Sequence, residues 1–236
     1  FGMSVAAAEL PELSRNRKAE LGGLNRQVST AVSRVTYFVW PTTLGYVFLG
    51  DSIVAGLFQT GAFGADEVVA TYLVLAGYSV GLLASSRSRV LSSAFYALRD
   101  TRTPAKISYL RVALSAVIGA AVMFPLDRFG IGDVRFGAVG LALGASVGAW
   151  VEYRMLKRRL GEALGPLGRS SSRTKWIRFG AAVLGLAVAE ALELGVGSWV
   201  ELHPVLEAVV VVGAFAGIYL LVTRTLGAGP ETAAEG

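Results

Sequence analysis

The sequence predicts an all-α fold, a polytopic bundle of transmembrane helices, and three observations lead to this prediction. Hydrophobic residues make up 53% of the 236 residues and glycine adds 29 more, whereas only 17% are charged. A soluble domain averages about 45–50% on the same apolar count, and a globule this apolar would expose more hydrophobic surface than monomers do. The apolar residues gather in six windows of about 20, the length that spans a bilayer. The basic residues crowd into alternate gaps between these windows.

The windows give the expected helices in order: 35–57, 68–86, 106–124, 138–156, 177–197 and 205–223. Before them, residues 1–13 are predicted to be the tail of a truncated transmembrane helix, so the chain is expected to be part of a longer protein. Residues 14–34 are polar and contain two adjacent glycines, and we expect a cytoplasmic connector here, with a short helix on the membrane surface. The other domains expected are four transmembrane helices in 35–176, and a helix pair with a short cytoplasmic tail in 177–236.

Prolines and glycines refine these helices. Pro104 and Pro204 suit the first turn of a helix, where a missing N–H costs nothing, and Pro125 closes the third window. Pro41 lies inside the first window, where it leaves the carbonyl of Tyr37 without its helical partner and predicts a kink. The fourth window has a face of small residues that predicts close helix packing, made of Gly137, Gly140, Gly144, Ser146, Gly148 and Ala149.

The composition excludes several kinds of site. Without cysteine, no disulfide, cysteine-ligated zinc or thiol nucleophile can form. His203 is the single histidine, and its place between two apolar windows favours an interfacial loop. No Walker A pattern for nucleotide binding occurs either. Taken together, these absences lead us to expect no cofactor, no metal and no enzymatic activity. A net charge of +5 is compatible with nucleic acid binding, but the cations lie between membrane windows, and no nucleic acid partner is expected.

Lysine and arginine are distributed unequally between the two sets of gaps. One set holds only Arg128 and Arg135, whereas the other holds sixteen basic residues. Because cytoplasmic loops are enriched in lysine and arginine, the C-terminus and the long connectors are expected in the cytoplasm. The sixteen residues are Arg15, Arg17, Lys18, Arg26, Arg34, Arg87, Arg89, Arg99, Arg102, Lys157, Arg158, Arg159, Arg169, Arg173, Lys175 and Arg224.

A series of short motifs resembles one known family. The motifs are FQTGAF at 58–63, YSVGL at 78–82, VLSSAFYA at 90–97 and DTRTPAKI at 100–107, together with FGMSV at the start and LPELS at 10–14. In this order and spacing they resemble the MurJ (MviN) family of lipid II flippases, within the multidrug/oligosaccharidyl-lipid/polysaccharide exporter superfamily. The resemblance extends over nearly the whole chain and is strongest over residues 58–107.

The resemblance implies a fold, a function and a location. The family has fourteen helices, so this chain would hold the tail of helix eight and helices nine to fourteen, a MATE-like C-terminal lobe plus an extra helix pair. Such proteins move lipid II, the undecaprenyl-linked peptidoglycan precursor, across the bacterial inner membrane by alternating access. The implied partners are this polyprenyl pyrophosphate glycan, membrane lipids and the missing N-terminal helices. The alternatives are a flippase for another polyprenyl-linked glycan, a MATE-type antiporter, and a non-transporting membrane scaffold.

A lipid pyrophosphate needs cations, and three arginines are candidates for substrate binding. Arg87 and Arg89 lie at the inner end of the second window, but two residues on a helix are about 200° apart, so both cannot face one cavity. Arg89 matches a family position usually held by lysine and is the first candidate. Arg87 matches a usually apolar position and is expected to snorkel to the lipid headgroups. Arg111, about 7.5 Å deeper than Lys106, either snorkels or lines a cavity, and snorkelling is favoured.

Ion coupling has less support in the sequence. Some members of the family bind sodium through carboxylate or carboxamide side chains of the eleventh helix, at positions that read Ser115 and Gly119 here. Only Ser115, and Ser146 on the next helix, remain as weak oxygen donors, so coupling to protons or to the membrane potential stays open. The acidic residues near the outer ends of the last two windows are expected at the periplasmic interface rather than in proton transfer, namely Glu190, Glu193 and Glu207.

Overall fold

The computed structural model describes residues 21–59, 63–131, 134–168, 171–199 and 204–230. The predicted helix tail at 1–13, the first residues of the predicted connector and His203 lie outside the described residues. Helices dominate the described chain, which confirms the predicted all-α class. They are α2 (Leu21–Phe48), α3 (Gly50–Phe58), α4 (Ala65–Ala97), α5 (Arg102–Leu126), α6 (Gly137–Leu164), α7 (Ser172–Trp199) and α8 (Pro204–Thr225).

A short hairpin interrupts the helical pattern between α5 and α6. Its strands are β1 (Gly130–Ile131) and β2 (Val134–Arg135), which pair antiparallel with Gly130 opposite Arg135. No strand is predicted in this gap between the apolar windows, because two-residue strands carry no alternating pattern long enough to detect. The hairpin brings the end of α5 to the start of α6 and leaves the bundle otherwise helical.

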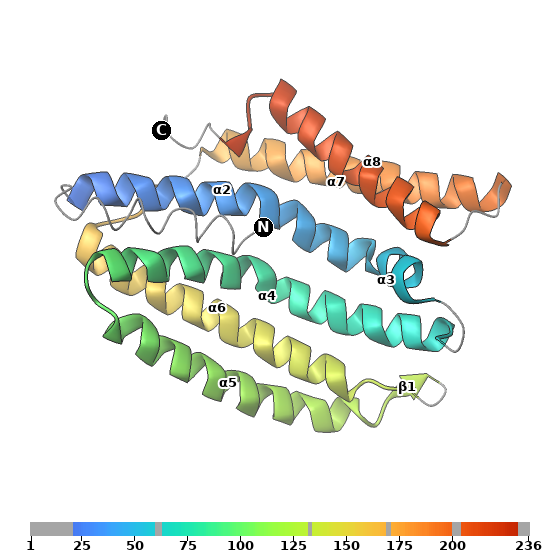
Figure 1. The fold of residues 1–236 in the computed structure, drawn as a ribbon, viewed down its shortest axis with the longest axis horizontal. Coiled ribbons are helices and arrows are strands. Elements are labelled where there is room, and N and C mark those ends of the chain that lie inside the picture. Colours follow the sequence, from blue (N-terminus) through green and yellow to red (C-terminus); the bar gives the residue numbers. More distant parts are fainter. Residues whose placement is uncertain (1–20, 60–62, 132–133, 169–170, 200–203, 231–236) are drawn as a thin grey trace.

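The helices form three layers that lie side by side (Figure 1). The middle layer is α2 with α3, and the α7–α8 pair covers one side of it. On the other side lie α4 and α6, and α5 packs on α6 at the outer edge. Helix α6 therefore contacts both α4 and α5, whereas α4 and α5 scarcely touch each other.

The membrane-spanning capacity of these helices differs from the six predicted spans. Among the described residues, α4, α5 and α8 are each long and apolar enough to cross a bilayer, and α2 and α3 together form a fourth, bent by 75° at the break between them. The windows 138–156 and 177–197 do form long helices, α6 and α7. Over the described residues neither helix meets the same criterion of length and apolar composition, and each window contains charged residues, for example Glu152 in α6 and Arg178 in α7.

The residues predicted as a polar connector differ from that prediction, because α2 begins at Leu21 and continues through them without a break. The buried residues of this segment are spaced by three or four, as on one face of a helix: Leu24, Val28, Ala31 and Val35. This stripe packs into the main core with α4 and α6. A composition average over 14–34 hides the stripe, since its polar residues lie on the other face.

Helix α2 continues through Pro41, and a bend of 75° lies at Leu49, between α2 and α3. The carbonyl of Tyr37, which proline cannot bond, accepts a 2.9 Å hydrogen bond from the hydroxyl of Tyr219 on α8. The hydroxyl of Tyr37 in turn lies 2.8 Å from that of Thr223. Because an unpaired carbonyl in an apolar interior costs free energy, the last helix supplies the partner that Pro41 removes.

The small-residue face of α6 makes the predicted close contacts. A Cβ added to Gly140 would lie 2.6 Å from the backbone nitrogen of Met123 on α5, so the two backbones are already at their closest approach. On the α4 side, a Cβ added to Gly81 would lie 2.7 Å from the Cα of Ser146. Glycine is therefore required by packing at both interfaces of α6, which confirms the predicted packing face.

The DTRTPAKI motif starts α5. One carboxylate oxygen of Asp100 accepts hydrogen bonds from the backbone N–H groups of Arg102 and Thr103, each 3.0 Å long. Hydrogen bonds from the Thr103 side chain and from these N–H groups lower the pKa of Asp100 below its ordinary value. The aspartate thus satisfies backbone donors that the first helical turn leaves without partners.

We predict that Gly140→Ala destabilises the full-length protein by about 1–3 kcal/mol, because the methyl group forces α5 away from α6. The measurement is the midpoint of thermal unfolding in detergent. Gly161→Ala is the matched control on the same helix, since nothing lies within 4 Å of its added Cβ. It should be neutral or slightly stabilising, because alanine favours helix more than glycine does. Equal midpoints for the two variants would contradict close packing at Gly140.

We predict that Asp100→Ala lowers stability by about 1 kcal/mol through loss of the helix cap. The lowered pKa of Asp100 makes the effect depend on pH. Its stabilisation is fully present above the ordinary pKa of aspartate, about 3.9, and is lost as pH falls through the lower pKa of the folded state. The difference in unfolding midpoint between wild type and Asp100→Ala should therefore shrink below about pH 4. A difference that stays constant down to pH 2.5 would show that the carboxylate charge does not stabilise the helix start.

Candidate functional site

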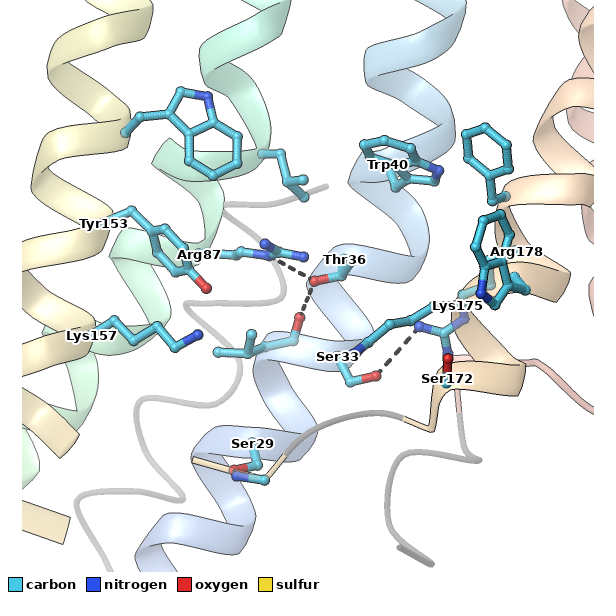
Figure 2. Close-up of a pocket in the computed structure, with 16 residues that line it drawn as sticks. Ser29, Ser33, Thr36, Trp40, Arg87, Tyr153, Lys157, Ser172, Lys175 and Arg178 are labelled. Carbon is cyan, nitrogen blue, oxygen red and sulfur yellow. Dashed lines mark hydrogen bonds between the residues drawn. The ribbon is translucent and has the colours of Figure 1, made fainter. Parts of the chain in front are cut away.

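A cavity of about 750 Å³ lies between α2, α4, α6 and α7. Its described lining has three parts, and Figure 2 shows the labelled side chains. Four cations line it together with no acidic residue: Arg87, Lys157, Lys175 and Arg178. Hydroxyl groups come from Ser29, Ser33, Thr36, Ser172 and Tyr153. The wall is otherwise largely aromatic, with Trp40, Trp150, Trp176 and Phe179.

Arg87 reaches from α4 across the cavity toward α2 (Figure 2). Its Nε donates a 2.9 Å hydrogen bond to the hydroxyl of Thr36, and its Cζ lies 5.5 Å from the ring centroid of Tyr153. The sequence analysis expects this side chain to snorkel to the headgroups. It lies between helices instead, because α2 and α6 cover this side of α4. None of the described carboxylates forms an ion pair with it.

Two lysines extend the positive charge of the cavity. Lys157 follows Tyr153 by one turn of α6, and its Nζ lies 5.9 Å from the centroid of the Tyr153 ring, so two cations, Arg87 and Lys157, lie near this ring. Lys175 comes from the first turns of α7. Within the described chain neither lysine lies within ion-pair distance of a carboxylate. With Arg87, the described lining of the cavity thus holds three cations, and none of them forms an ion pair with a described carboxylate.

Arg178 differs from the other cavity cations because its hydrogen bonds hold the fold together. It is 6% exposed. Its Nε and one terminal nitrogen donate to the carbonyls of Ala228 and Gly229, at 3.0 and 2.9 Å, just beyond the C-terminus of α8. The other terminal nitrogen lies 3.4 Å from the Ser33 hydroxyl. A cation is favourable at the negative end of a helix, so Arg178 fastens α8 to α7 and α2.

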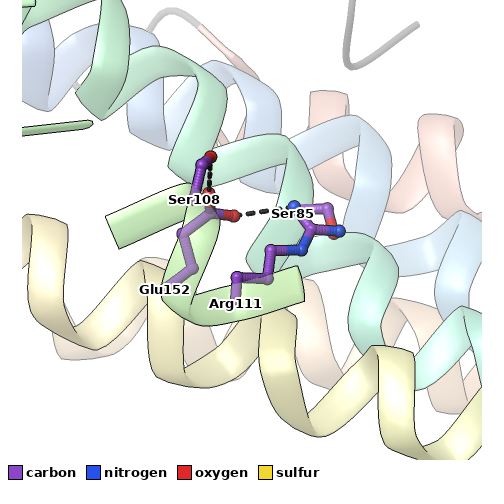
Figure 3. Close-up of polar contacts among 4 residues, drawn as sticks. All are labelled: Ser85, Ser108, Arg111 and Glu152. Atoms are coloured by element: carbon purple, nitrogen blue, oxygen red, sulfur yellow. Dashed lines mark hydrogen bonds and ion pairs between the residues drawn. The ribbon is translucent and has the colours of Figure 1, made fainter. Parts of the chain in front are cut away.

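A second polar cluster lies among α4, α5 and α6 (Figure 3). Arg111 forms a 2.7 Å ion pair with Glu152, and its other terminal nitrogen donates to the Ser85 hydroxyl at 3.3 Å. The second carboxylate oxygen of Glu152 accepts from Ser108 at 2.8 Å. Glu152 is buried, at 5% side-chain exposure, whereas Arg111 is one-third exposed. Arg111 therefore neither snorkels nor stands alone, because a buried partner holds it.

Glu152 is a residue that the sequence analysis did not single out. The available signal was an acidic side chain inside the apolar window 138–156, because an ionisable residue within a membrane helix nearly always has a partner. Arg111, at a similar depth on the preceding helix, was the matching charge. Reading the two together would have predicted the ion pair.

Arg89 is exposed on α4. The less buried residues of this helix recur every three or four positions and form one face: Tyr78, Leu82, Ser85, Arg89, Ser92 and Tyr96. Since Ser85 contacts Arg111, Arg89 and Arg111 belong to the same side of the lobe, which we call the open face. Arg87 points to the cavity on the other side, so the two neighbouring arginines do not share one site.

The two serines considered for ion binding make helix contacts. The Ser146 hydroxyl donates to the carbonyl of Gly77 on α4 at 2.5 Å and is 3% exposed. Ser115 on α5 packs against Gly148 of α6. They lie at opposite interfaces of α6, so the structure does not bring them together. In the described chain no group of three or more His, Asp or Glu residues gathers as a metal site.

Comparisons with known proteins agree on one family. The model of the family described as lipid II flippase MurJ matches residues 1–212. A protein of Buchnera aphidicola named "Probable lipid II flippase MurJ" is 29% identical over 182 residues, covering 76% of this chain and 32% of the relative. The lipid II flippase MurJ of Burkholderia cenocepacia is 28% identical over 195 residues, covering 81% and 34%. That of Thermosipho africanus is 28% identical over 147 residues, covering 62% and 28%. The chain spans about a third of the length of these curated relatives.

A solved structure shares the fold. "Lipid II flippase MurJ, inward closed conformation" matches with a TM-score of 0.70 at 17% identity, covering 96% of this chain and 43% of its own. Similarity at this level of identity establishes the arrangement of the helices and nothing about ligands. The family model, in contrast, covers residues 1–212 of the 236, and the chain therefore belongs to the MurJ family.

Proposed function

We propose that this chain is part of a membrane flippase that translocates lipid II from the cytoplasmic to the periplasmic leaflet by alternating access. The observation that carries the proposal is the family match over residues 1–212, since the curated relatives are named for this substrate. Family membership and the apolar helices make the protein a multi-pass membrane protein. Because the chain spans about a third of those relatives, further helices of the same protein would complete the transport path.

The proposed location is the bacterial inner membrane, with the C-terminus in the cytoplasm. The unequal distribution of lysine and arginine supports this orientation, sixteen residues against two. It places the loop between α4 and α5, the loop between α6 and α7, and the start of α2 on the cytoplasmic side. The β1–β2 hairpin would then lie on the periplasmic side.

The open face is the proposed wall of the substrate path. Arg89 is exposed there, and Arg111 presents the exposed third of its side chain beside it. Guanidinium groups bind phosphate oxygens in a bidentate manner, as a pyrophosphate-linked substrate requires. Arg111 is oriented by Glu152 and Ser85, whereas Arg89 has no described ion-pair partner. We therefore place the first substrate contact at Arg89.

The driving force is proposed to be other than sodium bound at the Ser115 position. Gly119 offers no side-chain oxygen, and Ser115 and Ser146 are separated by α6 and engaged in helix packing. Sodium sites need several oxygen ligands gathered around one point, and these residues do not provide them. Coupling to protons or to the membrane potential remains the proposed alternative.

We predict that Arg89→Ala in the full-length gene reduces rescue of a flippase-depleted strain, while the protein level in the membrane is unchanged. Loss of a charge-assisted contact of about 1.5–3 kcal/mol corresponds to roughly a 10- to 150-fold weaker interaction. Arg154→Ala is the matched control, since Arg154 is an exposed arginine on α6. Full rescue by Arg89→Ala would remove Arg89 from the substrate path. Failure of the wild-type gene to rescue would remove lipid II as the substrate.

We predict that Glu152→Met lowers the thermal unfolding midpoint more than the double change Arg111→Met with Glu152→Met. The single change leaves the Arg111 cation without its carboxylate, whereas the double change removes both charges, and only the first leaves a partly buried charge unpaired. The expected difference is about 1–3 kcal/mol, reduced from that of a fully buried pair by the exposure of Arg111. Equal midpoints would mean that the pair contributes no net stability to the lobe.

A further inference from the structure

We propose that the cavity between α2, α4, α6 and α7 is a binding site for the phosphate group of a membrane lipid, with Arg87, Lys157 and Lys175 as its ligands. This site is separate from the open face, because Arg87 lines the cavity between α2, α4, α6 and α7, whereas Arg89 lies on the exposed face of α4. It goes beyond the proposed transport function, since it does not depend on which lipid the whole protein moves.

The uncompensated positive charge of the cavity favours a bound anion. Arg87 is half-buried between helices, and its described contacts are the neutral Thr36 hydroxyl and the Tyr153 ring. Lys157 and Lys175 line the same cavity, and no described carboxylate pairs with any of the three cations. Three like charges near one cavity repel one another, and the half-buried position of Arg87 weakens the solvent screening of its charge, whereas Lys157 and Lys175 are exposed. A bound anion would relieve the repulsion and compensate the charge of Arg87.

The donor groups around the cavity indicate that this anion is a phosphate. A guanidinium fork and two ammonium groups, brought together from three helices, suit the several oxygens of a phosphate. The hydroxyl of Ser172 lines the same cavity and can donate to a remaining oxygen, whereas that of Ser29 already donates to Asn25. A volume of about 750 Å³ is typical of a site for a small ligand or a headgroup.

The order of polar and apolar residues along the cavity indicates that the phosphate would belong to a lipid. On α2, α4 and α6 the lining changes in the same direction, from mainly polar residues at the end that the charge distribution places in the cytoplasm to large apolar residues deeper in the membrane. On α2 the order is Ser29, Val32, Ser33, Thr36, Trp40, on α6 it is Lys157, Tyr153, Trp150, and on α4 Arg87 lies nearer that end than Leu83. On α7 both kinds alternate, in the order Ser172, Lys175, Trp176, Arg178, Phe179. A headgroup at the surface with its chain running inward matches this gradient, and basic pockets between membrane helices recognise lipid headgroups in this way.

Arg178 is not assigned as a ligand of the site. It lines the same cavity, but its nitrogens already donate to the carbonyls of Ala228 and Gly229 and to Ser33. Three of its five N–H donors are thus engaged and the residue is 6% exposed, so little of it is accessible to a ligand. The site is therefore assigned three cations rather than four, and the fourth holds the wall in place.

The test uses the purified full-length protein and its thermal unfolding midpoint. Dioleoylphosphatidylglycerol is titrated into detergent solution, with dioleoylphosphatidylcholine as the zwitterionic comparison and sodium phosphate as the lipid-free anion. We expect phosphatidylglycerol to raise the midpoint more than the other two. In the double variant Lys157→Gln/Lys175→Gln, the phosphatidylglycerol concentration that produces half of the midpoint increase should rise roughly 30-fold. This factor corresponds to about 1 kcal/mol for each lost cation.

A double variant that removes two cations outside the cavity is the control, Arg154→Gln with Arg158→Gln, since both arginines are exposed on the same helix as Lys157. It should keep the wild-type response. An unchanged response in the lysine variant, or an equal loss in the control, would overturn the site. An equal effect of sodium phosphate would show a free-phosphate site and overturn the lipid assignment. Because both lysines are exposed and form none of the described ion pairs, their replacement should leave the half-buried Arg87 and the fold intact, and these outcomes are independent of rescue by the whole gene.

Discussion

The close approach of α6 to α4 and α5 is the contact on which both polar sites depend. In a membrane no hydrophobic force drives helices together, so association relies on tight packing and hydrogen bonds. Gly140 meets the α5 backbone, and Ser146 meets Gly81 of α4. This packing puts Glu152 within 2.7 Å of Arg111 on one side of α6 and leaves Tyr153 facing Arg87 on the other. A wider spacing would separate charges that are stable here only because they meet their partners.

The attachment of α7 and α8 follows a different rule, the satisfaction of backbone carbonyls. Pro41 leaves the Tyr37 carbonyl without a helical donor, and the carbonyls of Ala228 and Gly229 lie beyond the end of α8. Tyr219 donates to the first and Arg178 to the other two. Arg178 also lies 5.1 Å over the ring of Tyr37. The C-terminal pair is thus joined to α2 by hydrogen bonds that cannot shift to water, which fixes one wall of the cavity.

The sequence predicted the helices well because their signals are local. Windows of apolar residues and the small-residue face of α6 were correct, and so was the separation of Arg87 from Arg89, which follows from helix geometry alone. Three features of the structure were not predicted from the sequence. The stripe at Leu24, Val28 and Ala31 was hidden by polar neighbours. The partner of Arg111 was on another helix, and the covering of Arg87 by α2 and α6 depends on how distant segments pack. Tertiary neighbours decide whether an arginine snorkels, pairs or lines a cavity.

Arg87 and Arg178 show how that decision can be read from contacts. Both are arginines in one cavity, and both lie near a tyrosine ring. The charge of Arg178 rests on two carbonyls at the end of a helix, where the backbone dipoles compensate it. Arg87 has a hydroxyl and a ring, which solvate a cation but do not neutralise it. Keeping such a charge partly buried costs free energy, and a bound anion would offset that cost. The contacts of the two arginines therefore distinguish a cation that holds the cavity wall in place from one whose charge is not compensated by the described residues.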